Sequence, residues 1–311
     1  MATFRAMVRF LVQFIRLSIR ARRWPDDGLF LRAVYRACLR REPDEGGRRH
    51  YVAALESKRM SRWDVWRAVV HSEEHAQVGH LPVHPLDAIH RARMGMVQRW
   101  LPSTRVIVDL GGAATGRPEG ALLAMGYPHR PESILIVDPL CASGPEPHVA
   151  LTTREGVRVS HLCRSMADPL PLADESVDLV FCGESIEHVT EVEAEAVCRE
   201  AFRICRPGGW FCLDTPNAAL TRLQSPDALI HPEHKKEYHV SELRDLVARC
   251  GFEVVEVRGL CPMPESLARG EFCFDELVLG SGLPAEPETC YVVFLKAVKA
   301  APACADASHS T

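Results

Sequence analysis

Hydrophobic runs typical of buried strands alternate with helical patterns along the second part of the chain. Short, continuous runs of β-branched and apolar residues indicate strands that are buried on both faces. They predict strands at residues 106–109, 133–137, 157–162, 177–182, 210–213, 253–257 and 290–298. Helical periodicity covers residues 119–125, 191–205 and 241–250. This alternation predicts an α/β domain whose mostly parallel sheet has helices on both faces.

The N-terminal part of the chain has only helical patterns. Its apolar positions predict helices at residues 4–23, 29–39, 48–56, 65–71 and 86–101. Prolines at 82 and 85 mark a linker. We therefore expect a basic amphipathic helix (1–24), a small helical domain (25–79), a linker and leading helix (80–103), an α/β domain (104–298) and a disordered tail (299–311).

The first 24 residues carry an unusual charge. They hold six arginines and no acid, whereas the whole chain has a net charge of −4, so the rest carries −10. The arginines run through the apolar core, which a cleaved secretory signal would not show. The helix could pack on its own protein or lie on an anionic membrane surface. A basic arm on an acidic body argues against a protein that coats nucleic acid.

The overall composition is that of an ordinary soluble globular protein, with 47% hydrophobic and 25% charged residues in 311. No apolar run is long enough to cross a membrane. The 12 cysteines form no Cys-x-x-Cys pair, so we interpret them as core thiols of a reducing cytosol. A cytoplasmic protein follows, peripheral at the inner face of the membrane if the basic helix binds there.

A turn rich in glycine and small residues follows the first predicted strand, which ends at Asp109. The sequence Leu-Gly-Gly-Ala-Ala-Thr-Gly covers residues 110–116. A strand, a tight turn and a helix in this order are the start of a nucleotide-type βαβ unit. Glycine in the turn lets a ligand approach the backbone closely. The dinucleotide fingerprint would need glycine where Ala113 stands, which argues against a dehydrogenase. Asp138 ends the second strand, where a carboxylate can accept both ribose hydroxyls or cap a turn.

Three later phrases change this picture. Leu-Pro-Leu-Ala-Asp-Glu-Ser-Val-Asp-Leu-Val covers residues 170–180, Glu-Ser-Ile-Glu-His-Val covers 184–189, and Arg-Ile-Cys-Arg-Pro-Gly-Gly covers 203–209. In this order and spacing they resemble the class I S-adenosylmethionine-dependent methyltransferases, of the methyltransferase type 11 kind. The resemblance implies a methyltransferase with a Rossmann-like, seven-stranded sheet whose last strand is antiparallel. S-adenosylmethionine (SAM) would be its cofactor.

The resemblance also implies where the cofactor binds. The turn would hold the methionine part, Asp138 the ribose, the segment after the third strand the adenine, and the end of the fourth strand the sulfonium. The corresponding residues are Asp109, Gly111, Gly112, Ala113, Asp138, Met166, Ala167, Asp168, Gly183 and Glu184. Ser165 stands where relatives often carry an acid, and Asp168 is expected to replace it.

Glu187 and His188 are the candidates for catalysis. Methyl transfer needs an in-line approach, and a hydroxyl acceptor benefits from a base or a metal. His188 is the candidate base, or else it packs against the next helix. On a helix, Glu184 would share a face with Glu187 and His188. The same phrase accompanies a divalent metal in the O-methyltransferases of ubiquinone biosynthesis. Acids at a helix N-terminus need no metal, so we expect none and keep Mg²⁺ as the alternative.

Residues 28–79 resemble a small bacterial helical domain of unknown function. The resemblance rests on Val-Tyr-Arg at 34–36, Arg-Glu-Pro-Asp at 41–44, Gly46 and Ser-Glu-Glu-His at 72–75. Such domains often accompany glycan-modifying and cell-envelope enzymes and bring no catalytic residues. We interpret this one as an interaction or scaffold module.

The acceptor is indicated by the polar stretch His-Pro-Glu-His-Lys-Lys-Glu-Tyr-His at 231–239, which would be a gate or a solvated loop. Relatives with a similar phrase are bacterial envelope and glycan-associated methyltransferases. We therefore expect O-methylation of a small-molecule, sugar, glycan or lipid-linked acceptor. The alternative is an inactive methyltransferase-like scaffold that works through the helical domain.

Overall fold

The computed structural model describes residues 26–39, 41–78, 85–140, 148–280 and 285–301. The chain divides into two compact units, residues 1–83 and 84–311. The predicted basic helix at 4–23 and most of the predicted tail lie outside the described residues.

The first unit is helical, as predicted. Its helices are α2 (Asp27–Leu39), α3 (Glu45–Glu56), α4 (Arg62–Val70) and α5 (Glu73–Val78). α2 contacts the other three. Arg41 pairs with Asp44 at 3.1 Å and with Glu74 at 2.5 Å, and Asp44 caps α3 by accepting from the Gly47 amide at 2.7 Å. The motif residues of this unit therefore hold its helices together.

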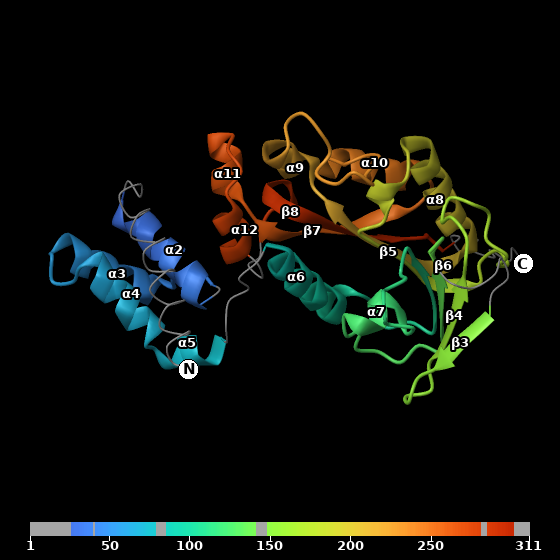
Figure 1. Cartoon of the computed structure of the whole chain (residues 1–311), viewed down its shortest axis with the longest axis horizontal. Helices are drawn as coiled ribbons and strands as arrows, with labels where there is room; N and C mark the ends of the chain where they lie inside the picture. Colours follow the sequence, from blue (N-terminus) through green and yellow to red (C-terminus); the bar gives the residue numbers. More distant parts are fainter. Residues whose placement is uncertain (1–25, 40, 79–84, 141–147, 281–284, 302–311) are drawn as a thin grey trace, which may run out of the picture. The chain divides into compact units, whose positions relative to one another are not determined.

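The second unit is built on one sheet. Within the described residues its strands are β1 (Val106–Leu110), β2 (Ser133–Val137), β3 (His148–Thr152), β4 (Arg158–Leu162), β5 (Val177–Gly183), β6 (Cys205–Pro216), β7 (Glu253–Pro262) and β8 (Cys290–Val298). Their order is β3-β4-β2-β1-β5-β6-β8-β7 (Figure 1). The neighbours from β4 to β6 are parallel. β8 runs antiparallel to β6 and β7, which confirms the antiparallel last strand.

The prediction of seven strands was wrong by one. β3 forms an antiparallel hairpin with β4 at the edge of the sheet. Gly156 closes this hairpin with a φ of +87°, a left-handed conformation that glycine adopts without strain. The short polar-flanked run at residues 148–152 lacks the continuous apolar pattern of the central strands, because an edge strand is not buried on both sides.

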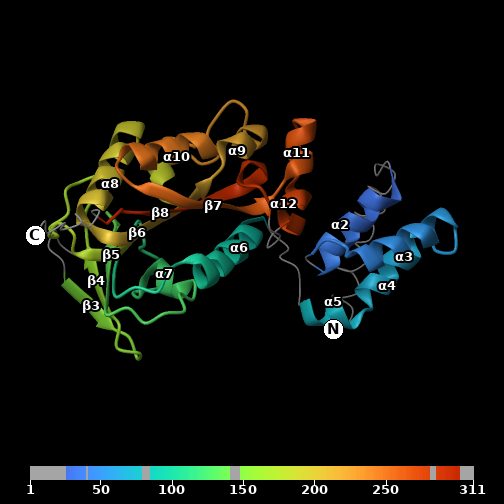
Figure 2. The ribbon, with the colours of Figure 1, turned by 180° about the vertical axis from the view of Figure 1, so that it is seen from behind.

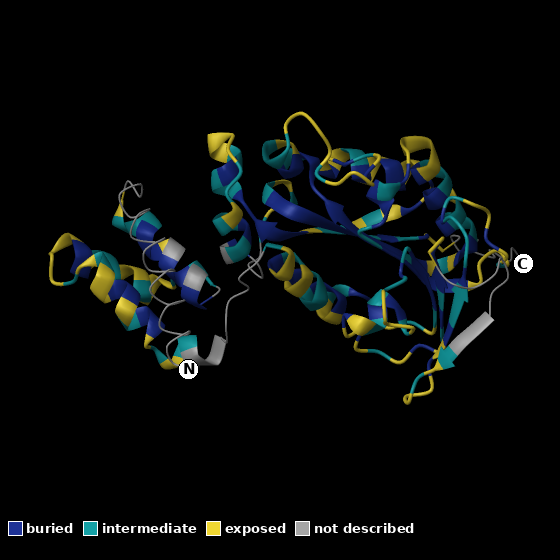
Figure 3. Ribbon diagram, in the orientation of Figure 1, coloured by how far each residue is buried: buried dark blue, intermediate teal, exposed yellow. Residues whose placement is uncertain are grey.

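Helices cover both faces of this sheet (Figures 1 and 2). α8 (Glu191–Ile204) and α10 (Val240–Arg249) pack on one face, and α6 (Pro85–Trp100) and α7 (Gly120–Ala124) pack on the other. Figure 3 shows the central strands buried and the outer helix faces exposed. The remaining elements are α9 (Ala218–Gln224), α11 (Pro264–Arg269), α12 (Phe274–Gly280), η1 (Ile186–His188) and η2 (Pro287–Thr289).

α6 belongs to the second unit, although the sequence placed it with the linker outside the α/β domain. Its apolar side buries Ala88, Ala92, Met96 and Val97 in the core beneath the sheet. The unit therefore begins with α6 rather than with the first strand.

Among the described residues, no helix combines the length and apolar composition needed to cross a membrane. The ten cysteines in the same ranges are all free, and eight of them are buried. Their burial agrees with their interpretation as core thiols.

Candidate functional site

Four acids meet at one edge of the sheet. Because β2, β1, β5 and β6 are parallel neighbours, their carboxyl ends lie side by side, and such edges are where ligands bind in α/β folds. Asp109 lies in β1, Asp138 follows β2, Glu184 follows β5, and Asp214 lies near the end of β6. The parallel topology brings together acids that are up to 105 residues apart in sequence.

The glycine turn after β1 lies tightly against this edge. Gly111 has a φ of +72°, and its amide donates to the Val137 carbonyl at 2.8 Å. A Cβ on Gly111 would lie 2.2 Å from the Ser185 hydroxyl oxygen. A Cβ on Gly112 would lie 2.2 Å from the Asp109 carboxylate. Both glycines are therefore required by the close approach of the Ser185 and Asp109 side chains, whereas the sequence predicted close approach of a ligand.

The third glycine of the turn was misplaced by the sequence. Gly116 faces open space, whereas a Cβ on Gly120 would lie 2.3 Å from the Ile136 side chain. Gly120 has a φ of +82° and allows α7 to pack closely on β2. Helix–strand packing of this kind is the task of the last glycine in the dinucleotide fingerprint.

Asp138 is placed to bind and to hold the turn. Its Oδ2 accepts from the Ala113 amide at 3.2 Å, and its Oδ1 accepts from the Leu140 amide at 2.8 Å. Each carboxylate oxygen retains further acceptor capacity. Asp138 therefore has the turn-cap role, one of the two alternatives that the sequence left open, and its free acceptor capacity is compatible with the other, ribose binding.

Asp109 has an unpartnered oxygen within the described structure. The residue is 1% exposed, and its Oδ2 is buried with no hydrogen-bond partner there. Burial raises the pKa of its carboxyl to about 7, with a backbone hydrogen bond from Leu122 and the charge of Arg93 acting in the opposite direction. An orphaned, desolvated carboxylate beside a tight glycine turn favours a positively charged ligand.

Arg93 of α6 lies beneath the acids, and the sequence analysis missed it. Its Nε donates to Asp214 Oδ2 at 2.5 Å, and its Nη1 lies 3.8 Å from Glu184 Oε2. Burial nevertheless raises the pKa of both Asp214 and Glu184. A signal was present, because position 93 falls within the apolar stripe 89, 92, 93, 96 and 97 of the helix.

Gly183 and Glu184 end β5 next to the turn. A Cβ on Gly183 would lie 2.8 Å from Arg93 Nη2. Glu184 adopts a left-handed φ of +49°, which is uncommon for a residue with a side chain. The helix expected from Glu184 onward was wrong: only Ile186–His188 form a short 3-10 turn. The strained backbone at Glu184 turns the chain before that turn begins.

Glu187 and His188 lie near Thr215 and His234, whereas Glu184 lies near Arg93. Glu187 is buried and accepts from the Thr215 hydroxyl at 2.9 Å. Burial, followed by the charge of Glu184, raises its pKa well above the ordinary value. Burial and then the charge of His234 lower the pKa of His188. Both effects favour the neutral form of the His188 imidazole.

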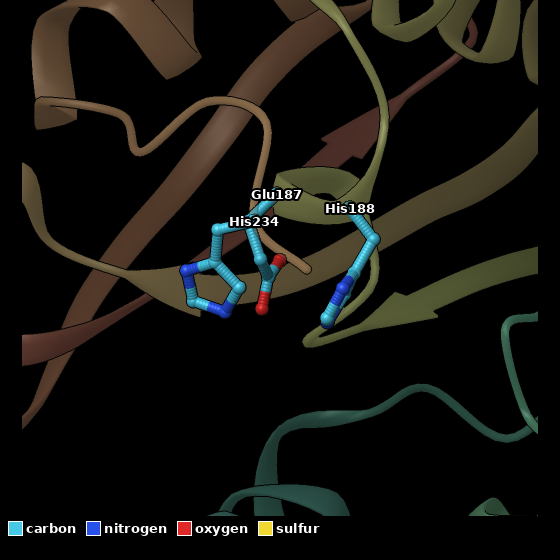
Figure 4. Close-up of side chains that lie close together, drawn as sticks. All are labelled: Glu187, His188 and His234. Carbon is cyan, nitrogen blue, oxygen red and sulfur yellow. The ribbon is translucent and has the colours of Figure 1, made fainter. Parts of the chain in front are cut away.

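The polar stretch at residues 231–239 is no simple solvated loop. The amide of Lys235 donates to the Glu187 carbonyl at 2.7 Å, and His234 and Glu237 are buried. The ring centroids of His234 and His188 lie 5.0 Å apart. Figure 4 shows both rings beside the Glu187 carboxylate. The contact of His234 with the candidate catalytic residues was not predictable from the sequence, because the two histidines are 46 positions apart.

The predicted adenine segment follows β4. Met166 is buried and Ala167 packs against the core, while Asp168 is exposed. The Ser165 hydroxyl accepts from the Ala167 amide at 3.2 Å, which is a local turn contact. Because the Asp138 amide donates to the Leu162 carbonyl at 3.1 Å, this segment begins beside the proposed ribose position.

Comparison with known proteins agrees with this architecture. Residues 144–213 match a family model described as a methyltransferase domain, and residues 21–78 match a domain of unknown function, DUF4214. A probable SAM-dependent methyltransferase of Mycolicibacterium smegmatis is 41% identical over 91 residues, which are 29% of this chain and 34% of that protein. A probable SAM-dependent methyltransferase of Mycobacterium tuberculosis is 37% identical over 103 residues, 33% of this chain and 36% of that protein.

Among solved structures, a SAM-dependent methyltransferase of Thermotoga maritima, described as a possible histamine N-methyltransferase, has a TM-score of 0.46 and 20% identity. The match covers 69% of this chain and 91% of that one. The matched stretch spans only about a third of the curated relatives' length.

The sheet topology, together with the match of residues 144–213 to a methyltransferase-domain model, makes the second unit similar to class I SAM-dependent methyltransferase domains. The residues similar to DUF4214 precede it in the chain.

Proposed function

We propose that this chain binds SAM at the carboxyl edge of its sheet and transfers the methyl group to a hydroxyl of a sugar, glycan or lipid-linked acceptor. The observation that carries the proposal is the acid cluster beside the glycine turn, which includes the buried, unpartnered oxygen of Asp109.

Charge supports a cationic cofactor. Three carboxyl groups, those of the buried Asp109 and Asp214 and of the half-buried Glu184, lie near the guanidinium of Arg93. This imbalance costs free energy unless a further positive charge arrives. SAM carries a sulfonium and an ammonium group and supplies an activated methyl when bound. The product, S-adenosylhomocysteine, lacks the sulfonium charge, so the same acids favour its release.

Shape supports the same cofactor. Gly111 and Gly112 allow the turn to lie tightly against Ser185 and Asp109, and glycine backbone also permits close approach of a ligand. Asp138 would accept the ribose hydroxyls with its remaining lone pairs. Met166 and Ala167 would flank the adenine, with Asp168 nearby, and Gly183 and Glu184 would face the sulfonium.

The acceptor would approach Glu187 and His188. In a metal-free enzyme, neutral His188 would take the proton of the acceptor hydroxyl, and Glu187 beside it would help to position the acceptor. The sugar, glycan or lipid-linked acceptor is proposed from the similarity of residues 231–239 to envelope-associated methyltransferases. An anionic membrane is a further proposed partner, through the arginines of residues 1–24.

Transfer of a radiolabelled methyl group from SAM to bacterial envelope fractions tests this function. We expect label in glycan or glycolipid, stable to mild alkali because an O-methyl ether survives where a methyl ester is hydrolysed. A His188→Ala chain that binds SAM should label at least tenfold less, since general base catalysis contributes about 10²–10⁴-fold. SAM binding without label in any fraction would favour the scaffold alternative.

A further inference from the structure

Three potential metal ligands converge beside the proposed acceptor position. Glu187 and His188 come from the turn after β5, and His234 comes from the stretch before α10. One ligand atom of each lies within 4.8 Å of the other two. Figure 4 shows the Glu187 carboxylate and the two imidazoles gathered in one place.

His234 is oriented by a protein acceptor behind it. His234 Nδ1 lies 2.9 Å from Glu237 Oε1, which leaves Nε2 for a ligand. Glu237 is itself fixed, because it accepts from the Thr221 hydroxyl at 2.5 Å and from the Ile230 amide at 2.9 Å. Metal-binding histidines typically donate their second ring nitrogen to a carboxylate or a carbonyl in this manner.

The carboxylate is also held in place. The Thr215 hydroxyl donates to Glu187 Oε2 at 2.9 Å, and the amides of Lys235 and Lys236 donate to the Glu187 carbonyl at 2.7 and 3.2 Å. These two amides tie the segment that carries His234 directly to the residue that carries the carboxylate. The three side chains are therefore supported as one unit.

We propose that Glu187, His188 and His234 bind a divalent transition metal of the Zn²⁺ class. Two imidazoles and one carboxylate are a ligand set of catalytic zinc sites, which leave a further position open for water or substrate. Mg²⁺ and Ca²⁺ prefer oxygen ligands, so this set differs from a magnesium site at Glu184 and Glu187. Glu184 faces Arg93 instead.

Binding requires a small contraction of the cluster. Ligand atoms about 2.1 Å from a shared tetrahedral ion lie about 3.4 Å apart, closer than the 4.8 Å limit that now encloses the three atoms. His188 is only partly buried, so rotation of its side chain can bring its ring nitrogen inward. The open position would accept an acceptor hydroxyl, and this role, unlike metal binding itself, rests on the proposed methyl transfer.

Titration of the full-length chain with Co²⁺ alone, without SAM, tests the site. Bound Co²⁺ absorbs visible light according to its coordination, so binding and geometry are read together. We expect one Co²⁺ per chain with a tetrahedral-type spectrum, displaced by Zn²⁺ but not by Mg²⁺. Glu237→Gln should weaken affinity about 10- to 100-fold, the usual effect of changing the partner behind a metal-bound histidine.

Variants of the ligands and of a neighbour complete the test. His234→Ala and Glu187→Gln should lose the Co²⁺ spectrum, whereas His231→Ala should keep it. His231 is exposed, and its ring centroid lies 5.5 Å from that of His234. It is therefore the matched control for non-specific Co²⁺ binding by surface histidines. Melting temperatures measured without metal identify variants that fail to fold.

Two results would overturn the site: no Co²⁺ binding by the wild-type chain, or equal loss in His231→Ala and His234→Ala. SAM titration of the EDTA-treated chain separates the two proposals. SAM binding that persists without any Co²⁺ site contradicts the metal alone. A Co²⁺ site in a chain that does not bind SAM contradicts the methyltransferase function alone.

Discussion

Burial of the Asp109 carboxyl suits a site for a positively charged ligand but lowers the stability of the folded protein above the normal pKa of an aspartate. Burial raises its pKa from 3.8 to about 7, so the folded protein binds its proton more tightly than the unfolded chain does. Between these pH values the folded state holds more protons, and the free energy of unfolding therefore falls as the pH rises. Above about pH 7 this contribution becomes constant.

Asp109→Asn should remove that pH dependence. At about 1.4 kcal/mol per pKa unit, the free energy of unfolding of the variant relative to the wild type should be about 2–3 kcal/mol higher at pH 8 than at pH 5. Urea denaturation at both pH values measures it. Asp245→Asn, at an exposed position of α10, is the control and should show no such change. If the free energy of unfolding of Asp109→Asn differs from that of the wild type by the same amount at pH 5 and pH 8, the raised pKa of Asp109 is contradicted.

Residues at strand ends were predictable because a parallel sheet fixes where they lie. Asp109, Gly111 and Asp138 come directly after apolar runs, and the fold brings them together at one edge. Arg93 and His234 belong to elements whose docking depends on tertiary packing, which periodicity does not encode. Their sequence neighbourhoods carry only weak signals: an arginine within an apolar stripe, and a polar stretch whose burial is not apparent from its composition.

At the scale of elements, the close packing of α7 on β2 depends on Gly120. Gly120→Ala combines a left-handed φ with a Cβ 2.3 Å from the Ile136 side chain and 3.2 Å from the Gly112 carbonyl oxygen. Gly116→Ala is the matched control, with a φ of +71° and open space. The left-handed conformation alone costs about 1–2 kcal/mol. Urea denaturation should show a larger loss for Gly120→Ala, and equal losses would refute the packing role.

Arg93 fastens α6 to β6 by its ion pair with Asp214, which is fully buried. Arg93→Met leaves that carboxylate without its partner, and we expect a loss of about 3–5 kcal/mol in the free energy of unfolding. Arg93→Lys retains the charge but not the planar fork and should lose less. Arg99→Met, exposed on the same helix, should be nearly neutral. Thermal and urea denaturation compare the three, and equal effects at 93 and 99 would refute the anchoring role.

Most elements of the sheet were predictable, because buried parallel strands are continuous apolar runs. β3 and α9 were missed for different reasons. β3 is a short edge strand formed by a hairpin, and α9 (Ala218–Gln224) is too short for its periodicity to stand out. α11 and α12, in the connection between β7 and β8, were also absent from the predicted elements.

At the scale of the whole molecule, the two units separate between Val83 and His84. All proposed cofactor residues belong to the second. Chains that begin at Pro25 or at His84 should therefore bind SAM as tightly as the full chain. Only the full chain should float with anionic liposomes, since each arginine near such a surface contributes about 1 kcal/mol. Weaker SAM binding by the chain that begins at His84 would contradict the assignment of SAM binding to the second unit. Equal flotation of all three chains would contradict membrane binding by residues 1–24.

The central claim is that the carboxyl edge of the sheet binds SAM with Asp138 at the ribose, and a calorimetric titration tests it most directly. Hydrogen bonds to a charged group contribute about 1.5–3 kcal/mol, so Asp138→Ala should weaken SAM binding by about 10- to 150-fold. Because Asp138 also accepts from the amides of Ala113 and Leu140, its melting temperature is measured beside that of the exposed control Asp245→Ala. We predict binding by the wild type and the control and the stated loss in a folded Asp138→Ala chain; undetectable binding by the wild type, or unchanged affinity in Asp138→Ala, would contradict the account.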